Sequence, residues 1–167
     1  MSSPLQIAID GIQFARRYTN RLLDQIDESE WFWMPEPRVT HVAWQVGHLT
    51  FAQYRLALDR IRGERPEDSE FVSAEFLKIF GRDSFPDPDP SKYPSPGEIR
   101  ATFERVHERV LLELPSLPES EWYAPILKPH SLFNRKIESL QWCSHHETIH
   151  AGQIGLLRRL MGKPPMW

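Results

Sequence analysis

Histidine spacing near the end of the chain is the clearest chemical signal in this sequence. The run HHETIH places His146 and His150 four residues apart, and on a helix this spacing puts both imidazoles on one face. Trp142, Gln153 and Leu157 continue that face, so we expect it to point inward. Imidazole nitrogen is a common ligand of zinc and related divalent ions, so the pair predicts half of a metal site.

The same run matches the HExxH signature of zinc peptidases, in which Glu147 would be the general base. The segment after His150 is AGQIGLLRRLMGKPPMW, which contains no histidine, aspartate, glutamate or cysteine. Common peptidases of this type take their third ligand from downstream of the motif. A third side-chain ligand must therefore come from upstream, which weakens the peptidase interpretation. For Glu147, a solvated position on the helix surface is an equal alternative to a catalytic role.

His48 is the best upstream candidate for the third ligand. It lies one turn after Trp44 and borders the apolar row of its predicted helix, so it can face the interior of a bundle, where helical proteins build metal sites. Three neutral imidazoles leave coordination positions for water or substrate, as catalytic metal sites require. Two alternatives remain open, a metal that is only structural and histidines that pack without any metal.

Other polar side chains rank below these three histidines. His41 lies at a helix start and His107 at the edge of an apolar stripe. His130 lies in a proline-rich loop, and His145 lies one residue off the ligand face. Cys143 is interpreted as small apolar filler. Gln153 lies one turn beyond His150, and it could orient a ligand or serve as a packed core amide.

Four amphipathic segments must position these residues. Apolar periodicity predicts helices over 4–27, 40–62, 96–114 and 139–161, with a short helical piece over 71–80. The helix starts are marked by Ser3 with Pro4, by Thr40, and by Ser95 with Pro96 and Glu98. The helix ends are marked by Gly63, by Pro115, and by Gly162 followed by two prolines.

The connections between these segments give no sign of a sheet. The stretch FPDPDPSKYPSP contains five prolines in twelve residues, which forbids regular helix or central strand and predicts a long surface crossover. The aromatic segment Trp31 to Pro37 should cover one end of the core. We find no alternating strand pattern, repeat or second domain. The sequence therefore predicts one all-α domain over residues 1–167, a four-helix bundle with long crossover connections.

Composition narrows the class of partner. Of 167 residues, 40% are hydrophobic and 26% charged, and the formal net charge is −3 with both signs scattered. This pattern gives no case for a nucleic acid or an acidic membrane surface as partner. No apolar run is long enough to span a bilayer, and the first residues do not resemble a signal peptide. A single cysteine excludes an internal disulfide, and we expect a cytoplasmic protein.

Two segments resemble the DinB/YfiT-like family of metal-binding four-helix bundles. These are WQVGHL around His48 and HHETIHAGQIGLLRRLMGKPP at the end, and the resemblance covers essentially the whole chain. It implies that His48, His146 and His150 carry one divalent ion, zinc or nickel. It also implies long crossovers and frequently a homodimer. Members with an assigned reaction are thiol transferases that use low-molecular-weight thiols, or hydrolases.

We therefore expect a metal-dependent transferase or hydrolase that acts on a small-molecule substrate. Such an ion is a Lewis acid that lowers the pKa of a bound water or thiol, and Glu147 is the candidate general base. The alternatives are a non-catalytic metal-binding or structural bundle and, behind it, an HExxH-type zinc peptidase. For a homodimer, the aromatic cluster at residues 31–33 and Trp167 could supply an apolar patch.

Overall fold

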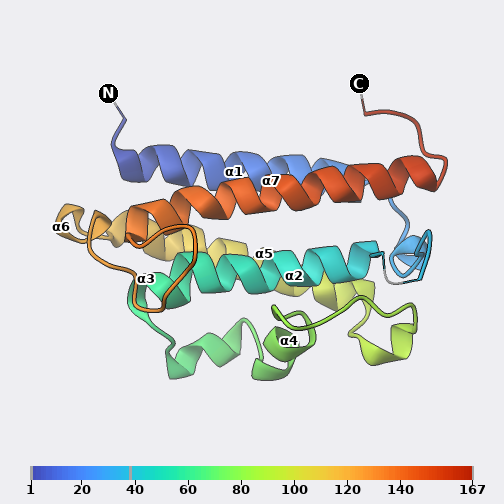
Figure 1. Ribbon diagram of the computed structural model, residues 1–167, viewed down its shortest axis with the longest axis horizontal. Coiled ribbons are helices and arrows are strands. Elements are labelled where there is room, and N and C mark those ends of the chain that lie inside the picture. The colour runs from blue at the N-terminus through green and yellow to red at the C-terminus, as the bar shows by residue number, and fades with distance from the viewer. Residues whose placement is uncertain (1, 38, 167) are drawn as a thin grey trace.

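Four long helices form the body of the protein in a computed structural model, which describes residues 2–37 and 39–166 (Figure 1). They are α1 (Pro4–Leu23), α2 (Val42–Tyr54), α5 (Pro96–Glu113) and α7 (Lys136–Leu160). Helix α1 packs along α7, and α2 contacts both α5 and α7. None of the described residues forms a β-strand, apart from an isolated bridge between Pro125 and Arg135. The all-α bundle expected from the sequence is confirmed.

The winding of the bundle explains its long crossover. Figure 1 shows α1 and α7 running in one direction and α2 and α5 in the other. Because α2 and α5 are parallel, the chain between them must return along the length of the bundle. It does so through short helices: η3 (Pro66–Glu70), α4 (Ala74–Ile79) and η4 (Pro90–Lys92). The buried Asp68 anchors the start of this return, since it accepts hydrogen bonds from Tyr54 Oη (2.9 Å) and Arg62 Nη2 (2.7 Å).

Local capping signals set several helix ends. Ser3 Oγ accepts from the Gln6 amide at 3.1 Å, and Ser95 forms the expected capping box with Glu98. Helix α5 ends at Glu113, next to the predicted stop at Pro115, and runs into the short helix η5 (Leu114–Ser116). These ends are decided by bonds within one turn, so sequence is sufficient to find them.

Other ends differ from the sequence-based boundaries. Helix α1 stops at Leu23, because the chain turns into the short helix η1 (Glu28–Glu30) after Asp27. The cap of α2 is His41 and not Thr40: His41 Nδ1 accepts from the Trp44 amide at 3.1 Å, while the Thr40 hydroxyl accepts from Gln45 Nε2 at 2.9 Å. Helix α7 begins three residues early, and α6 (Glu119–Trp122) precedes it.

The second long helix is interrupted where the sequence predicts a continuous one. After α2 comes a π-helical turn, η2 (Arg55–Asp59), and then α3 (Arg60–Arg62), which ends at Gly63 with φ 84°. The Arg60 amide donates to the carbonyls of Arg55, five residues back, and Leu58, and not to that of Leu56. The buried Ser139 hydroxyl of α7 donates to the Leu56 carbonyl at 2.7 Å. A side chain from another helix therefore satisfies the carbonyl that the wide turn bypasses.

Apolar side chains from all four long helices fill the core, and Trp31 covers one end of it with 1% of its surface exposed. Trp33 is 39% exposed. Trp31 is therefore not available for the apolar patch expected at residues 31–33, and Trp167 lies outside the described residues. Within residues 2–37 and 39–166, no helix has both the length and the apolar character needed to cross a membrane.

Candidate metal centre

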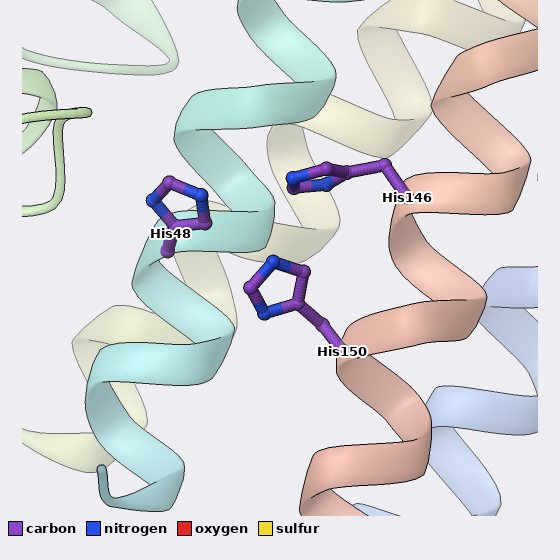
Figure 2. Close-up of side chains that lie close together, drawn as sticks. All are labelled: His48, His146 and His150. Carbon is purple, nitrogen blue, oxygen red and sulfur yellow. The ribbon is translucent and has the colours of Figure 1, made fainter. Parts of the chain in front are cut away.

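Three histidines from two helices converge at the middle of the bundle (Figure 2). His48 comes from α2, and His146 and His150 from α7. The ring centroids are 5.5 Å apart for His48 and His146, 5.0 Å for His48 and His150, and 4.5 Å for His146 and His150. One potential ligand atom from each residue lies within 4.8 Å of the other two. The structure thus brings together the three residues that the sequence selected.

His48 is held on both sides of its ring. The ring stacks on Trp44 with centroids 4.8 Å apart and planes 7° from parallel, and its Nδ1 donates to the Phe80 carbonyl at 3.0 Å. Gly47 makes this bond possible, because a Cβ at that position would lie 2.2 Å from the Phe80 ring. A glycine is therefore required where the segment after α4 meets α2.

His150 is held by Gln45, a residue that the sequence analysis did not single out. The Nδ1 atom of His150 is 2.5 Å from Gln45 Oε1. Gln45 Nε2 donates to Thr40 Oγ1 at 2.9 Å and to Gln153 Oε1 at 2.8 Å, which orients its oxygen toward the histidine. Gln153 therefore acts through Gln45 and not as a core amide. Gln45 is fully buried in the structure, and the available sequence signal was a glutamine three residues before His48 on the same predicted helix.

These hydrogen bonds decide which nitrogens remain free. A carbonyl oxygen only accepts, so His48 and His150 must each carry the proton on Nδ1 and leave the Nε2 lone pair unprotonated. Burial is the main reason why the pKa values of all three histidines are lowered, to about 4 for His146 and about 3 for His150. Histidine binds metals as a neutral imidazole whose other ring nitrogen donates its N–H to an acceptor.

The donor set fits one divalent ion. An ion about 2.0–2.1 Å from each nitrogen needs ligand nitrogens roughly 3.3 Å apart, and the 4.8 Å limit observed here is within reach of small ring rotations. Three imidazoles and no thiolate suit zinc, nickel or a similar ion, and they leave coordination positions open.

Glu147 points away from the histidines and into the contact between α1 and α7. It is 3% exposed, so the expected alternative of a solvated side chain is wrong. Arg16 of α1, itself 2% exposed, donates Nε to Glu147 Oε1 at 2.9 Å. Its other nitrogens donate to the Phe103 carbonyl at 2.8 Å and to Gln53 Oε1 at 2.7 Å. This carboxylate is committed to an ion pair, so the HExxH interpretation lacks its base.

Most of the remaining candidates have structural roles. His41 is fully buried, and its two ring nitrogens bond the Trp44 amide and the Asp87 carbonyl. His107 Nδ1 accepts from Gln53 at 3.0 Å, and burial lowers its pKa to about 3. Cys143 is buried filler, as expected, and burial raises the pKa of its thiol. His145 is exposed, and His130 stacks on Phe133 with centroids 4.0 Å apart.

A cavity of about 950 Å³ opens beside the histidines, with His48 and His146 in its wall. Phe51, Leu56, Leu132 and Trp142 form its apolar surface, and the loop before α7 supplies residues 128–132. A ligand of the size of a small metabolite or cofactor fits such a volume. None of the described residues that line the cavity is an aspartate or glutamate.

Comparisons with known proteins agree with this description. A family model for the DinB superfamily matches residues 12–154. Among solved structures, the chain is similar to a crystal structure described as the conserved protein of locus from Enterococcus faecalis, with a TM-score of 0.73 and 16% identity over 98% of this chain and 100% of that chain. At that identity the likeness supports the fold alone. A comparison with curated proteins finds no match.

Proposed function

Because this chain belongs to the DinB superfamily, we propose that His48, His146 and His150 bind one divalent ion, zinc or nickel, in an enzyme for a small-molecule substrate. The observation that carries the proposal is the convergence of three neutral imidazoles within 4.8 Å of one another, two of which, His48 and His146, line a cavity. When bound, the ion supplies Lewis acidity, which lowers the pKa of a coordinated group. The protein's own part is to hold the imidazoles and to shape the cavity.

We favour a thiol-dependent transferase over a hydrolase. No described carboxylate lines the cavity, and Glu147 is paired with Arg16. A reaction without a positioned carboxylate base favours the more acidic nucleophile, and a thiol with a pKa of about 8.5 loses its proton far more readily than water. In this proposal Trp142 and Phe51 pack against the apolar part of the substrate and exclude water around it. Glu147 has no role as a base.

Metal analysis tests the binding step. Protein purified without a histidine tag and dialysed against zinc should retain about one equivalent, and the His146→Ala variant should retain less than a tenth of that. The same measurement after dialysis against nickel, compared with the zinc result, identifies the ion that the protein prefers. Equal metal content in the wild type and the variant would contradict the proposed ligands.

Two measurements separate an enzyme from a bundle with a structural ion. A structural metal is strongly coupled to folding, so chelation would then lower the melting temperature sharply. The core here is large and does not depend on the site, so we expect a shift of a few degrees at most. A screen of low-molecular-weight thiols with electrophilic acceptors, compared with His48→Ala, tests the transferase directly. Loss of the fold on chelation, with no turnover in the screen, would favour the non-catalytic alternative.

The proposal also includes a homodimer and a cytoplasmic location. The exposed apolar side chains Ile7 and Phe14 on α1 and Ile149 and Leu156 on α7 support association through that side of the bundle. Light scattering on a size-exclusion eluate would measure the mass of the assembly. A mass of about one chain at micromolar concentration would contradict the dimer.

A further inference from the structure

The cavity beside the histidines carries a concentrated positive charge. Four basic side chains line it, Arg55, Arg60, Arg82 and Lys128. The protein as a whole has a formal net charge of −3, so this concentration is local and does not follow from composition. A cavity with low-dielectric walls strengthens such a field and attracts ligands of the opposite sign.

The π-helical turn is what brings two of these arginines together. In a regular α-helix, residues five apart are rotated by about 140° from one another, which would put Arg55 and Arg60 on different faces. Here the Arg60 amide bonds the Arg55 carbonyl directly, so the two residues lie one above the other. The Ser139 hydroxyl on the Leu56 carbonyl holds the turn in this form. Turns of this kind are frequent at functional sites.

Only part of this charge is neutralised by the protein. Asp59, fully buried, pairs with Arg55 at 2.8 Å and with Lys128 at 2.7 Å, and Glu64 lies 3.8 Å from Lys128. Arg60 donates only to the carbonyls of Arg55 and Pro129, both at 3.4 Å, and its buried Nε has no acceptor among the described residues.

Arg82 is exposed at the cavity and forms no hydrogen bond or ion pair with any described residue. The positive field of Arg60 and Arg82 also reaches His130 in the same cavity. The pKa of that histidine is lowered, first by burial and then by these two charges. Arg60 and Arg82 therefore face the cavity without an ion pair to any described carboxylate.

We propose that this cavity is an oxyanion-binding site, in which Arg60 and Arg82 bind the carboxylate or phosphate of an amphipathic small molecule whose apolar part packs on Phe51 and Trp142. Guanidinium groups pair with both oxyanions through parallel hydrogen bonds. As the assignment of a substrate class, this inference rests on the proposed function, whereas binding of the anion does not need the metal.

Phenyl phosphate and benzoate are suitable probes, with benzyl alcohol as their uncharged counterpart. Binding is measured by calorimetry on the full chain, first stripped of metal by a chelator and then loaded with zinc. We expect phenyl phosphate or benzoate to bind the metal-free protein at least tenfold more tightly than benzyl alcohol, and less tightly as salt is added. The ratio between the two anions identifies the preferred oxyanion.

Arginine variants locate the site. Arg82→Gln should weaken binding of the preferred anion by about tenfold, the loss expected for one charged hydrogen bond, and Arg60→Gln should do the same. Arg17→Gln removes the same charge from an exposed position on α1, outside the cavity, and should leave binding unchanged. Arg82 is exposed, so its variant should fold normally, which circular dichroism checks.

The outcomes distinguish this inference from the proposed function. Equal affinities for the anions and benzyl alcohol, or an Arg82→Gln variant that binds like the wild type, would overturn the inference even if zinc binds. Conversely, the metal-deficient His146→Ala variant should keep the arginine-dependent part of the binding. If the wild type binds no metal but retains that selectivity, the proposed metal site fails and the oxyanion site stands.

Discussion

Replacing Glu147 tests whether this carboxylate is structural or catalytic. Arg16 and Glu147 are 2% and 3% exposed and 2.9 Å apart. In Glu147→Ala, the Arg16 guanidinium keeps the Phe103 carbonyl and Gln53 as acceptors, but it loses its close anion. Removing one partner of a buried pair costs about 3–5 kcal/mol. Glu104, 3.8 Å from Arg16, partly compensates, so we expect a loss of about 3 kcal/mol in the free energy of unfolding.

Two further variants define the origin of this loss. Glu147→Gln keeps an acceptor for Arg16 Nε but not the charge, so it should cost about 2 kcal/mol. A double variant, Arg16→Met with Glu147→Leu, removes both charges and should lie within about 1–2 kcal/mol of the wild type, because a well-packed apolar pair can replace a buried ion pair. A domain of this kind has a total stability of about 5–15 kcal/mol, so these differences are readily measured.

The assay is equilibrium urea unfolding of the metal-free protein, followed by circular dichroism. Thr148→Ala, an exposed change on the same helix, is the control and should shift the free energy by less than about 0.5 kcal/mol. If Glu147→Ala matches this control, the ion pair does not stabilise the bundle and the reasoning is refuted. Once an activity is found, Glu147→Gln should retain most of it, whereas loss of a general base lowers the rate by about 10²–10⁴-fold.

Three other substitutions test the site and its surroundings. Gln45→Leu removes the acceptor of His150 Nδ1 and should weaken zinc affinity by about 10–100-fold in a chelator competition; an unchanged affinity would contradict the assigned tautomer. The pKa of His107 is lowered from 6.5 to about 3 in the folded protein, so the unfolded chain takes up the proton first. The contribution of this group to the free energy of unfolding is therefore complete above pH 6.5. It decreases as the pH is lowered, by about 2 kcal/mol at pH 5. Urea unfolding above pH 6.5 and at pH 5 should show that the free energy of unfolding falls less in His107→Gln than in the wild type. An equal fall in both proteins would count against burial as the cause of the lowered pKa. Gly47→Ala places a Cβ 2.2 Å from the Phe80 ring and should cost about 1–3 kcal/mol, seen as a lower melting temperature; an unshifted melt would mean that the ring moves freely.

Local signals in the sequence were sufficient for the four long helices, though not for all of their ends, and for the three histidines. Serine and proline at helix starts and glycine at helix ends act within one turn, so Ser3, Ser95 and Gly63 could be identified without tertiary structure. The spacing of His146 and His150 defines one face of any helix. Residues 151–167 contain no histidine, aspartate, glutamate or cysteine, and His48 borders the apolar row of its own helix, which made it the best candidate for the third ligand.

The tertiary structure decided what neighbouring helices do to those residues. Glu147 is adjacent to a candidate ligand in sequence, yet its neighbour in space is Arg16, 131 residues away along the chain. Gln45 became part of the site because its helix faces His150 across the bundle. The π-helical turn receives a hydrogen bond from a hydroxyl of α7, and its wide geometry places Arg55 and Arg60 on one side, where both line the cavity. Periodicity records the preferences of a single helix, whereas these partners are set by packing between helices, which no local pattern encodes.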